Sequence, residues 1–237
     1  MRLARRLVAE TLGTAFLLAV VVGSGIMAER LAGGNVAIAL LANAVATGAG
    51  LFALILTFAP VSGAHFNPAV SLAMWMRGES SGRDAAAYAG VQCLGAILGV
   101  AAAHGMFDLP LLAVSHHQRI GLSQAWSELV ATYGLILVII GSARFSAKST
   151  PAAVAAYITA AYWFTASTSF ANPAVAIARA FTDTFAGIAP GGVPAFVVAE
   201  LAGCIAAVLT AKLLYPQIAA QATSPAACPD AQAHWKL

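Results

Sequence analysis

Long apolar stretches separated by short polar connections make up most of the chain. Six of these stretches reach the roughly 20 residues that a helix needs to cross a bilayer. We therefore predict transmembrane helices at about 8–27, 35–59, 85–106, 125–143, 151–168 and 194–215. Two further apolar stretches, at about 68–77 and 173–182, are too short to span and are predicted to be half-helices that re-enter the membrane from opposite sides.

The tripeptide Asn-Pro-Ala begins both short stretches, at Asn67 and again at Asn172. Asn is a favoured N-cap because its side chain accepts a free backbone N–H of the first turn, and Pro68 and Pro173 suit the first helical position. Each tripeptide therefore predicts a helix start. Inside a membrane such a start is tolerated only where protein or a water-filled cavity satisfies the backbone, so the pair predicts a pore.

The same landmarks occur in the same order in two halves of the chain, at about 1–118 and 119–216. Each half contains three spans, so the second half enters from the opposite face and the repeat is inverted. We predict one channel domain over 1–216 and a disordered cytoplasmic tail at 217–237. The paired landmarks are Glu10 with Glu128, Asn67 with Asn172, and Gln92 with Glu200.

Composition agrees with a membrane protein. Apolar residues make up 60% of the 237 positions and charged residues 9%, with a mean hydropathy of +0.84, whereas a soluble domain carries about 25% charge. The formal charge of +3 reflects membrane topology and gives no reason to expect a nucleic-acid partner. Because basic residues accumulate in cytoplasmic loops, both termini are predicted to be cytoplasmic, and the first span is predicted to be retained rather than cleaved as a signal peptide. The residues on that side are Arg2, Arg5, Arg6, Arg77, Arg83, Arg144, Lys148 and Lys236.

The two motifs and the paired glutamates together resemble those of the major intrinsic protein family, the aquaporins and aquaglyceroporins. The resemblance covers about residues 5–216 and is carried by residues 62–70, by Asn172-Pro173-Ala174, and by Glu10 and Glu128. It implies an aquaporin-like, all-α membrane fold of six transmembrane helices and two half-helices. It also implies one pore per subunit and a homotetramer. Residues 23–30 and 181–187 resemble a bacterial branch associated with arsenic resistance, which implies a bacterial inner membrane.

The centre of the predicted pore combines the two Asn side chains with two helix ends. Each helix N-terminus carries about half a positive elementary charge, so two opposed ends disfavour cations and protons. Asn67 and Asn172 are expected to offer amide N–H groups to a passing solute while their carbonyl oxygens cap the helices. The resemblance implies that His65 lies on the pore wall, against the alternative of a purely structural hydrogen-bonding residue.

Glu10 and Glu128 are ionisable groups inside predicted spans, where an unpaired charge is costly. The resemblance implies a structural role in which each glutamate accepts backbone N–H groups of a re-entrant loop. A proton relay is the alternative. Glu200 is either protonated or bonded to a neighbouring helix, and no transport role is assigned to it.

The predicted selectivity filter departs from that of most family members. Val175 stands where most members have Arg, and Arg179 follows one helical turn later, pointing either to the constriction or to the membrane interface. The second-span and fifth-span filter positions fall on Thr47 and near Ala160, both small. Phe170 is either an aromatic pore wall or a loop-packing residue. These positions predict a filter wider than that of a strict water channel.

We therefore predict a passive channel for small uncharged solutes, namely water, glycerol-like polyols and metalloid hydroxides such as arsenous acid, with exclusion of ions and protons. The alternatives are a narrow water-selective aquaporin, an ion-coupled secondary transporter and a structural membrane scaffold.

No phosphate loop, nucleophile triad or cofactor motif is apparent in the sequence, so neither an enzyme nor a cofactor is predicted. His116 and His117 are adjacent in a loop with no carboxylate at ligand spacing, so no metal site is predicted. The three cysteines, Cys93, Cys204 and Cys228, show no zinc spacing.

Overall fold

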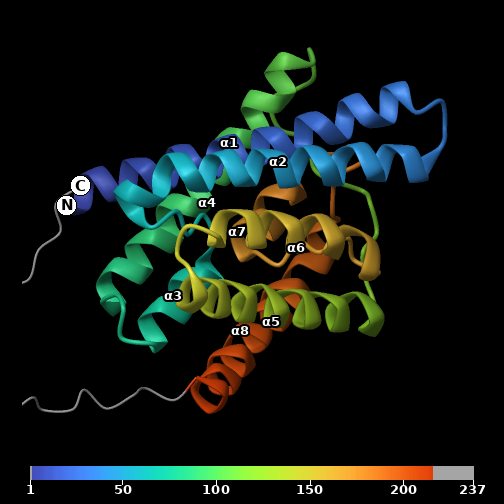
Figure 1. Cartoon of the computed structure of the whole chain (residues 1–237). Coiled ribbons are helices and arrows are strands. Elements are labelled where there is room, and N and C mark those ends of the chain that lie inside the picture. Colours follow the sequence, from blue (N-terminus) through green and yellow to red (C-terminus); the bar gives the residue numbers. More distant parts are fainter. Residues whose placement is uncertain (1, 216–237) are drawn as a thin grey trace, which may run out of the picture.

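The computed structural model describes residues 2–215, and every regular element in that part of the chain is a helix (Figure 1). The predicted tail at 217–237, with Lys236 and Cys228, lies outside the described residues. The prediction of an all-α fold is confirmed for these residues. The elements are α1 (Leu3–Leu31), α2 (Val36–Ser62), α3 (Pro68–Met76), α4 (Gly82–Met106), α5 (Leu122–Phe145), α6 (Thr150–Phe164), α7 (Pro173–Ala178), η1 (Arg179–Phe181), η2 (Pro190–Gly192) and α8 (Val193–Leu214).

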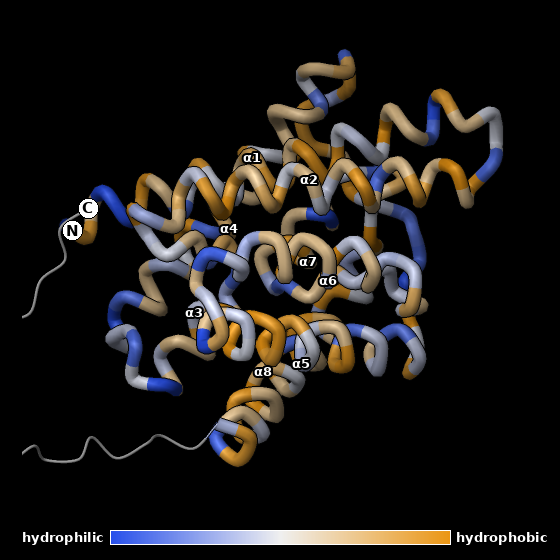
Figure 2. The backbone as a smooth tube through the Cα atoms, in the orientation of Figure 1, coloured by the Kyte–Doolittle hydropathy of each residue, from blue (hydrophilic) through white to orange (hydrophobic). Residues whose placement is uncertain are grey.

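Five helical segments are long and apolar enough to cross a membrane, namely α1, α2, α4, α5 and the stretch Pro190–Leu214 that joins η2 to α8. Large apolar side chains are exposed along their outer faces, as expected where lipid is the solvent. Figure 2 shows that orange, hydrophobic tube dominates these helices, while blue segments gather at their ends and in the connections. The protein is therefore a multi-pass membrane protein.

The predicted span at 151–168 is too long by four residues at its C-terminal end. The helix α6 has 15 residues and ends at Phe164. The next residues leave the helical conformation, and both Thr168 (φ 65°) and Ser169 (φ 52°) adopt left-handed backbone angles that no α-helix contains. The hydroxyl of Thr165 donates to the carbonyl oxygen of Ala161 at 2.7 Å and satisfies one of the last helical acceptors.

The two halves pack in the same way, as an inverted repeat requires. The first and third spans of each half are in contact, α1 with α4 and α5 with α8, and α2 meets α6 between the halves. Each half-helix, α3 and α7, contacts both α4 and α8. Small residues allow the close crossings, since a Cβ at Gly99 would overlap the carbonyl oxygen of Ala15 on α1, and one at Gly203 would overlap that of Leu129 on α5.

We expect Gly99→Val to separate α1 from α4. Its methyl groups meet backbone, which cannot move aside as a side chain can, so the substitution should cost at least about 1–3 kcal/mol of stability. Gly90→Val on the same helix is the matched control, because a Cβ at Gly90 has no neighbour within 4 Å. The temperature at which each purified variant loses its monodisperse chromatographic peak measures the difference. Equal loss in both variants would contradict the assigned crossing.

Both half-helices begin where the sequence predicts. The side-chain oxygen of Asn67 accepts from the backbone N–H of Ala69 at 2.8 Å, and that of Asn172 accepts from Ala174 at 3.0 Å. The second half-helix is shorter than its predicted range of 173–182. Its regular part ends at Ala178, and a 3₁₀ turn of Arg179–Phe181 follows, because the backbone carbonyl of Arg179 accepts from Ile188 and the chain turns away there.

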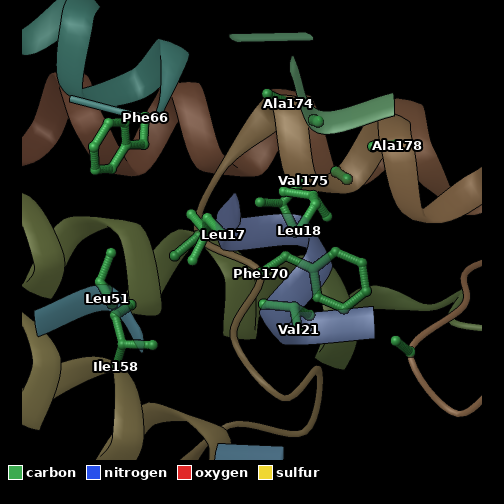
Figure 3. Close-up of a cluster of buried hydrophobic side chains, with 14 of the residues drawn as sticks. Leu17, Leu18, Val21, Leu51, Phe66, Ile158, Phe170, Ala174, Val175 and Ala178 are labelled. Carbon is green, nitrogen blue, oxygen red and sulfur yellow. The ribbon is translucent and has the colours of Figure 1, made fainter. Parts of the chain in front are cut away.

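The buried centre of the bundle is built from both halves. Figure 3 shows side chains of α1, α2 and α6 converging with those of the two re-entrant segments. The labelled residues are Leu17, Leu18, Val21, Leu51, Phe66, Ile158, Phe170, Ala174, Val175 and Ala178. Several of them also form the apolar wall of the cavity described below.

Candidate functional site

A cavity of about 320 Å³ lies between the two halves and is lined by α1, α2, α5 and α6 and by both re-entrant loops. Thr150 and Tyr162 of α6 line it toward opposite ends, and their 12-residue separation corresponds to a length of roughly 18 Å along the helix. One end is lined by Met74, Glu79 and Thr150, and the other by Thr47, Tyr162, Phe170 and Arg179. We call the second the arginine end.

The two re-entrant loops share an unusual backbone conformation. Ala64 and Phe66 before the first motif have φ values of 51° and 49°, and Ser169 and Ala171 before the second have 52° and 48°. These are equivalent positions, three residues and one residue before each Asn. Left-handed backbone costs free energy in residues other than Gly and persists only where the surroundings hold it, and such residues cluster at functional sites.

The paired glutamates hold these loops. The carboxylate of Glu10 accepts from the backbone N–H groups of His65 at 3.0 Å and Phe66 at 2.7 Å. That of Glu128 accepts from the N–H groups of Phe170 at 2.9 Å and Ala171 at 2.7 Å. Both glutamate side chains are completely buried.

The two Asn side chains bind the loops to one another. The amide nitrogen of Asn67 donates to the carbonyl oxygen of Ala171 at 2.7 Å, and that of Asn172 donates to the carbonyl oxygen of Phe66 at 2.8 Å. This reciprocal pair was not predicted; the only signal for it in the sequence is the mirrored position of the two motifs. Each side-chain amide carries two N–H groups, and the bond to the opposite loop uses only one of them. The second N–H of each Asn is therefore not used in these two bonds. Both Asn residues line the cavity.

His65 also lines the cavity, on the side away from the arginine end. Its Nδ1 lies 3.0 Å from the hydroxyl of Ser71 on α3, and its ring packs edge-on against Tyr88 of α4. The side chain therefore has a fixed orientation between a half-helix and a span.

The prediction that Ala160 lies at the filter is wrong. Ala160 is exposed on the outer face of α6, whereas Ile158 and Tyr162 line the cavity. Neighbours at i and i+4 share a helix face, and a residue two positions away points about 200° around the helix. The predicted register was off by two residues, because residues 167–171 do not align with the family pattern without a gap and the count back from Asn172 went too far. An aromatic ring therefore occupies the position that was predicted to be small.

Thr47 and Tyr162 meet at the arginine end. The hydroxyl oxygens of Thr47 on α2 and Tyr162 on α6 lie 3.1 Å apart, and both side chains are buried. Val175 lines the same cavity from α7. The bond between the two hydroxyls joins the two halves across one wall of the cavity.

The two orientations that the sequence left open for Arg179 are resolved in favour of the cavity. Its side chain is only 2% exposed, and its Nε donates to the carbonyl oxygen of Ala186. The guanidinium carbon lies 3.4 Å from the centroid of the Phe170 ring. Arg179 and Phe170 thus form one stacked unit that lines the cavity.

Arg119 supports this unit from the loop between α4 and α5. Its guanidinium donates to the carbonyl oxygens of Gly187 at 2.8 Å, Ser167 at 3.2 Å and Phe185 at 3.3 Å, and its Cζ lies 5.5 Å from the Phe170 ring centroid. Burial lowers the pKa of Arg119 below its usual value. This role of Arg119 could not be predicted from the sequence, because its hydrogen-bond partners are backbone atoms that no motif reveals.

His116 has a carboxylate neighbour that the sequence did not predict. Its Nδ1 lies 3.0 Å from the carboxylate of Asp183, which also accepts the backbone N–H of His116 at 2.8 Å. The two residues are far apart in sequence, so spacing could not reveal the pair. Within residues 2–215, no group of three His, Cys, Asp or Glu side chains forms a metal site.

The Asp183 contact predicts a pH-dependent difference in stability. The backbone N–H of His116, followed by its ring, holds the pKa of Asp183 below the ordinary value, so the carboxylate contributes stability above that ordinary pKa and loses it as the pH falls through the lowered one. We expect Asp183→Asn to unfold at a lower temperature than the native chain at pH 7. The two melting temperatures should converge below about pH 4, and a constant difference across that range would contradict the assignment.

Comparison with known proteins agrees with this geometry. The model of the family "Major intrinsic protein" matches residues 1–159. The chain belongs to the major intrinsic protein family. It is 57% identical over 205 residues to Aquaglyceroporin AqpS of Rhizobium meliloti (strain 1021), covering 86% of this chain and 88% of that protein. It is also 32% identical over 168 residues to Probable aquaporin AqpM of Archaeoglobus fulgidus, covering 60% of this chain and 67% of that one.

A solved structure of the family shares the fold. The X-ray structure of the aquaglyceroporin from Plasmodium falciparum aligns with a TM-score of 0.74 at 23% identity, over 91% of this chain and 98% of that one. The family membership and the lined cavity make this protein a membrane channel. The resemblance that the sequence predicted is confirmed.

Proposed function

We propose that the protein is a passive channel for water, glycerol-like polyols and metalloid hydroxides such as arsenous acid, and that it excludes ions and protons. The observation that carries the proposal is the meeting of Asn67 and Asn172 on the wall of one cavity between two opposed half-helices. The name of the relative with 57% identity, an aquaglyceroporin, supports polyol conduction.

The two walls of the cavity suit a polyol. Apolar side chains such as Val21, Leu51 and Val154 line one part, and the re-entrant backbone with its two Asn amides lines another. A polyol carries hydroxyl groups on one edge and C–H groups on the other. In the cavity its hydroxyl groups replace their hydrogen bonds to water with hydrogen bonds to the loops, while its C–H groups contact the apolar wall. No charged partner is needed for this exchange. Arsenous acid, a neutral trihydroxide, presents the same kind of surface.

Exclusion of cations has two sources in this proposal. The N-terminal ends of α3 and α7 place partial positive charge near the two Asn residues. Arg179 adds a full charge at the arginine end, one turn beyond the position where most family members carry it. No ion pair partners Arg179 in the described part of the chain. The displaced arginine thus serves as the filter cation.

Tyr162 changes the expected width of the filter. The sequence predicted small residues at both span positions, whereas the structure pairs Thr47 with a tyrosine. This observation supports a narrower constriction than the sequence implied and favours, as second candidate, a narrow water-selective channel. Relative rates for water, glycerol and arsenous acid separate the two functions.

Thr47→Phe is the direct test of the filter. A phenyl ring in place of a hydroxyl that touches Tyr162 occupies space in the cavity, so we expect glycerol and arsenous acid permeation to fall by at least about tenfold, equivalent to 1.4 kcal/mol. Stopped-flow light scattering on proteoliposomes measures each rate. Thr57→Phe is the matched control, because Thr57 lies on the exposed face of the same helix.

Four outcomes distinguish the candidate functions. Loss of solute flux in Thr47→Phe alone supports the proposed filter. Water flux with no glycerol or arsenous acid flux in the native chain supports the water-selective alternative. Flux that requires an ion gradient would support a coupled transporter, and no flux at all in a folded protein would support a scaffold.

Assembly and orientation follow the family in this proposal. The exposed apolar side chains on the outer faces of the spans suit contact with lipid and with other copies in a homotetramer. The distribution of basic residues supports cytoplasmic termini in a bacterial inner membrane. The pore lining contains no residue to which we assign a catalytic role.

A further inference from the structure

The glutamates beneath the two re-entrant loops have different partners on the third span of each half. In the first half, Gln92 on α4 lies beside Glu10, and its amide nitrogen donates to that carboxylate at 2.8 Å. In the second half, Glu200 on α8 occupies the equivalent place beside Glu128. A neutral amide donor in one half therefore corresponds to a carboxyl group in the other.

The hydrogen bonds of Glu200 are incomplete for a carboxylate. Its Oε1 accepts from the backbone N–H of Asn172 at 3.0 Å, which joins α8 to the first residue of the second motif. Its Oε2 is buried without a hydrogen-bond partner. Both oxygens of Glu128, in contrast, accept a loop N–H, from Phe170 and Ala171. Acceptance at both oxygens is the pattern of an ionised carboxylate.

Two ionised carboxylates side by side in this place would be very unfavourable. Glu128 and Glu200 are each 0% exposed, and neither forms an ion pair within the described residues. The groups that face Glu200 are Glu128 on α5 and, at longer range, Arg179 after α7. Like charges in contact without solvent cannot both ionise, so the pair retains one proton.

We propose that Glu200 is a neutral carboxylic acid whose Oε2–H donates to the Glu128 carboxylate, in the way that the Gln92 amide donates to Glu10. The proton completes the hydrogen bonds of Oε2, and each half of the protein then keeps a single buried negative charge beneath its loop. Glu200 is thereby a positioning residue. It holds Asn172 through the backbone and Glu128 through the proton, whichever neutral solute the cavity conducts.

Infrared spectroscopy of the reconstituted native protein tests the protonation state. At about pH 7.5 solvent-exposed carboxyl groups are ionised, so a carbonyl band of a protonated carboxyl group at that pH comes from a buried acid. We expect this band in the native protein and its loss in Glu200→Gln. A native spectrum without the band at that pH would overturn the proposal, and this measurement does not depend on any variant folding.

A pair of variants locates the proton on Glu200 rather than Glu128. Glutamine copies the neutral acid, since it accepts at one atom and donates at the other, so Glu200→Gln should melt within a few degrees of the native protein. Glu128→Gln cannot accept N–H groups at both atoms, so its melting temperature should fall by at least about 5 °C. The reverse order, with Glu200→Gln the more damaged, would overturn the assignment.

Discussion

Replacing Glu10 by alanine is expected to remove the first re-entrant loop from its native position and abolish channel activity. The carboxylate accepts four hydrogen bonds, two from the loop backbone, one from the Ser62 hydroxyl at 2.6 Å and one from Gln92 at 2.8 Å. In Glu10→Ala all four donors stay buried but lose their acceptor. Removing one member of such a set costs about 3–5 kcal/mol, a large share of the stability of a typical domain.

Glu29→Ala is the matched control for this experiment, because Glu29 lies on the same helix, α1, and is exposed. Glu10→Ala should give little monodisperse protein in detergent and no glycerol flux above that of empty liposomes, while Glu29→Ala should resemble the native chain. If the Glu10→Ala protein is stable and conducts glycerol, the loop keeps its left-handed backbone conformation without the glutamate, and the assigned role of Glu10 is wrong.

Replacing Arg179 by leucine is expected to admit cations. The guanidinium is a full positive charge on the cavity wall, and at a distance of about 5 Å a unit charge opposes a cation by about 3 kcal/mol in a medium of intermediate dielectric. We therefore expect proton or sodium leakage in Arg179→Leu to exceed that of the native protein by at least about tenfold. Phe170 also loses its stacking partner, so the constriction should become wider.

Fluorescence from a pH-sensitive dye inside proteoliposomes measures the leak, and glycerol uptake by the same vesicles measures the width. Arg83→Leu is the control, because Arg83 is exposed at the start of α4. A proton leak no greater than that of the native protein would mean that the half-helix ends alone exclude cations, and Arg179 would then be a structural residue.

The parts of the fold that could be predicted from the sequence depend on local patterns of residues. Capping and the first-turn proline act within three residues, so Asn67 and Asn172 showed where the half-helices begin. Apolar length predicted a helix at each of the six spans, of which five are long and apolar enough to cross a membrane in the described residues, and the repeated order of landmarks predicted the inverted repeat. The end of α6 was predicted wrongly, because residues 165–171 contain no Gly or Pro to mark a helix end, although four of the seven are Ser or Thr and their backbone leaves the helix.

The parts of the site that could not be predicted depend on contacts between distant segments. Ala160 was assigned to the filter by counting along the chain, and a two-residue error on a helix moves a side chain to the opposite face. The hydrogen bonds from the Asn amides reach the loop of the opposite half. The contact of Arg119 with Phe170 likewise joins two different loops. No local pattern encodes those pairs.

Solute flux and ionic current, measured through the same protein, test directly whether it is a channel for neutral solutes that excludes ions. The native chain is reconstituted into vesicles for stopped-flow glycerol uptake and into planar bilayers for electrical recording. We expect glycerol uptake well above that of protein-free vesicles, independent of any ion gradient, and no ionic current above that of the bare bilayer. Glycerol uptake equal to that of protein-free vesicles, or a steady cation current, would contradict the proposed function.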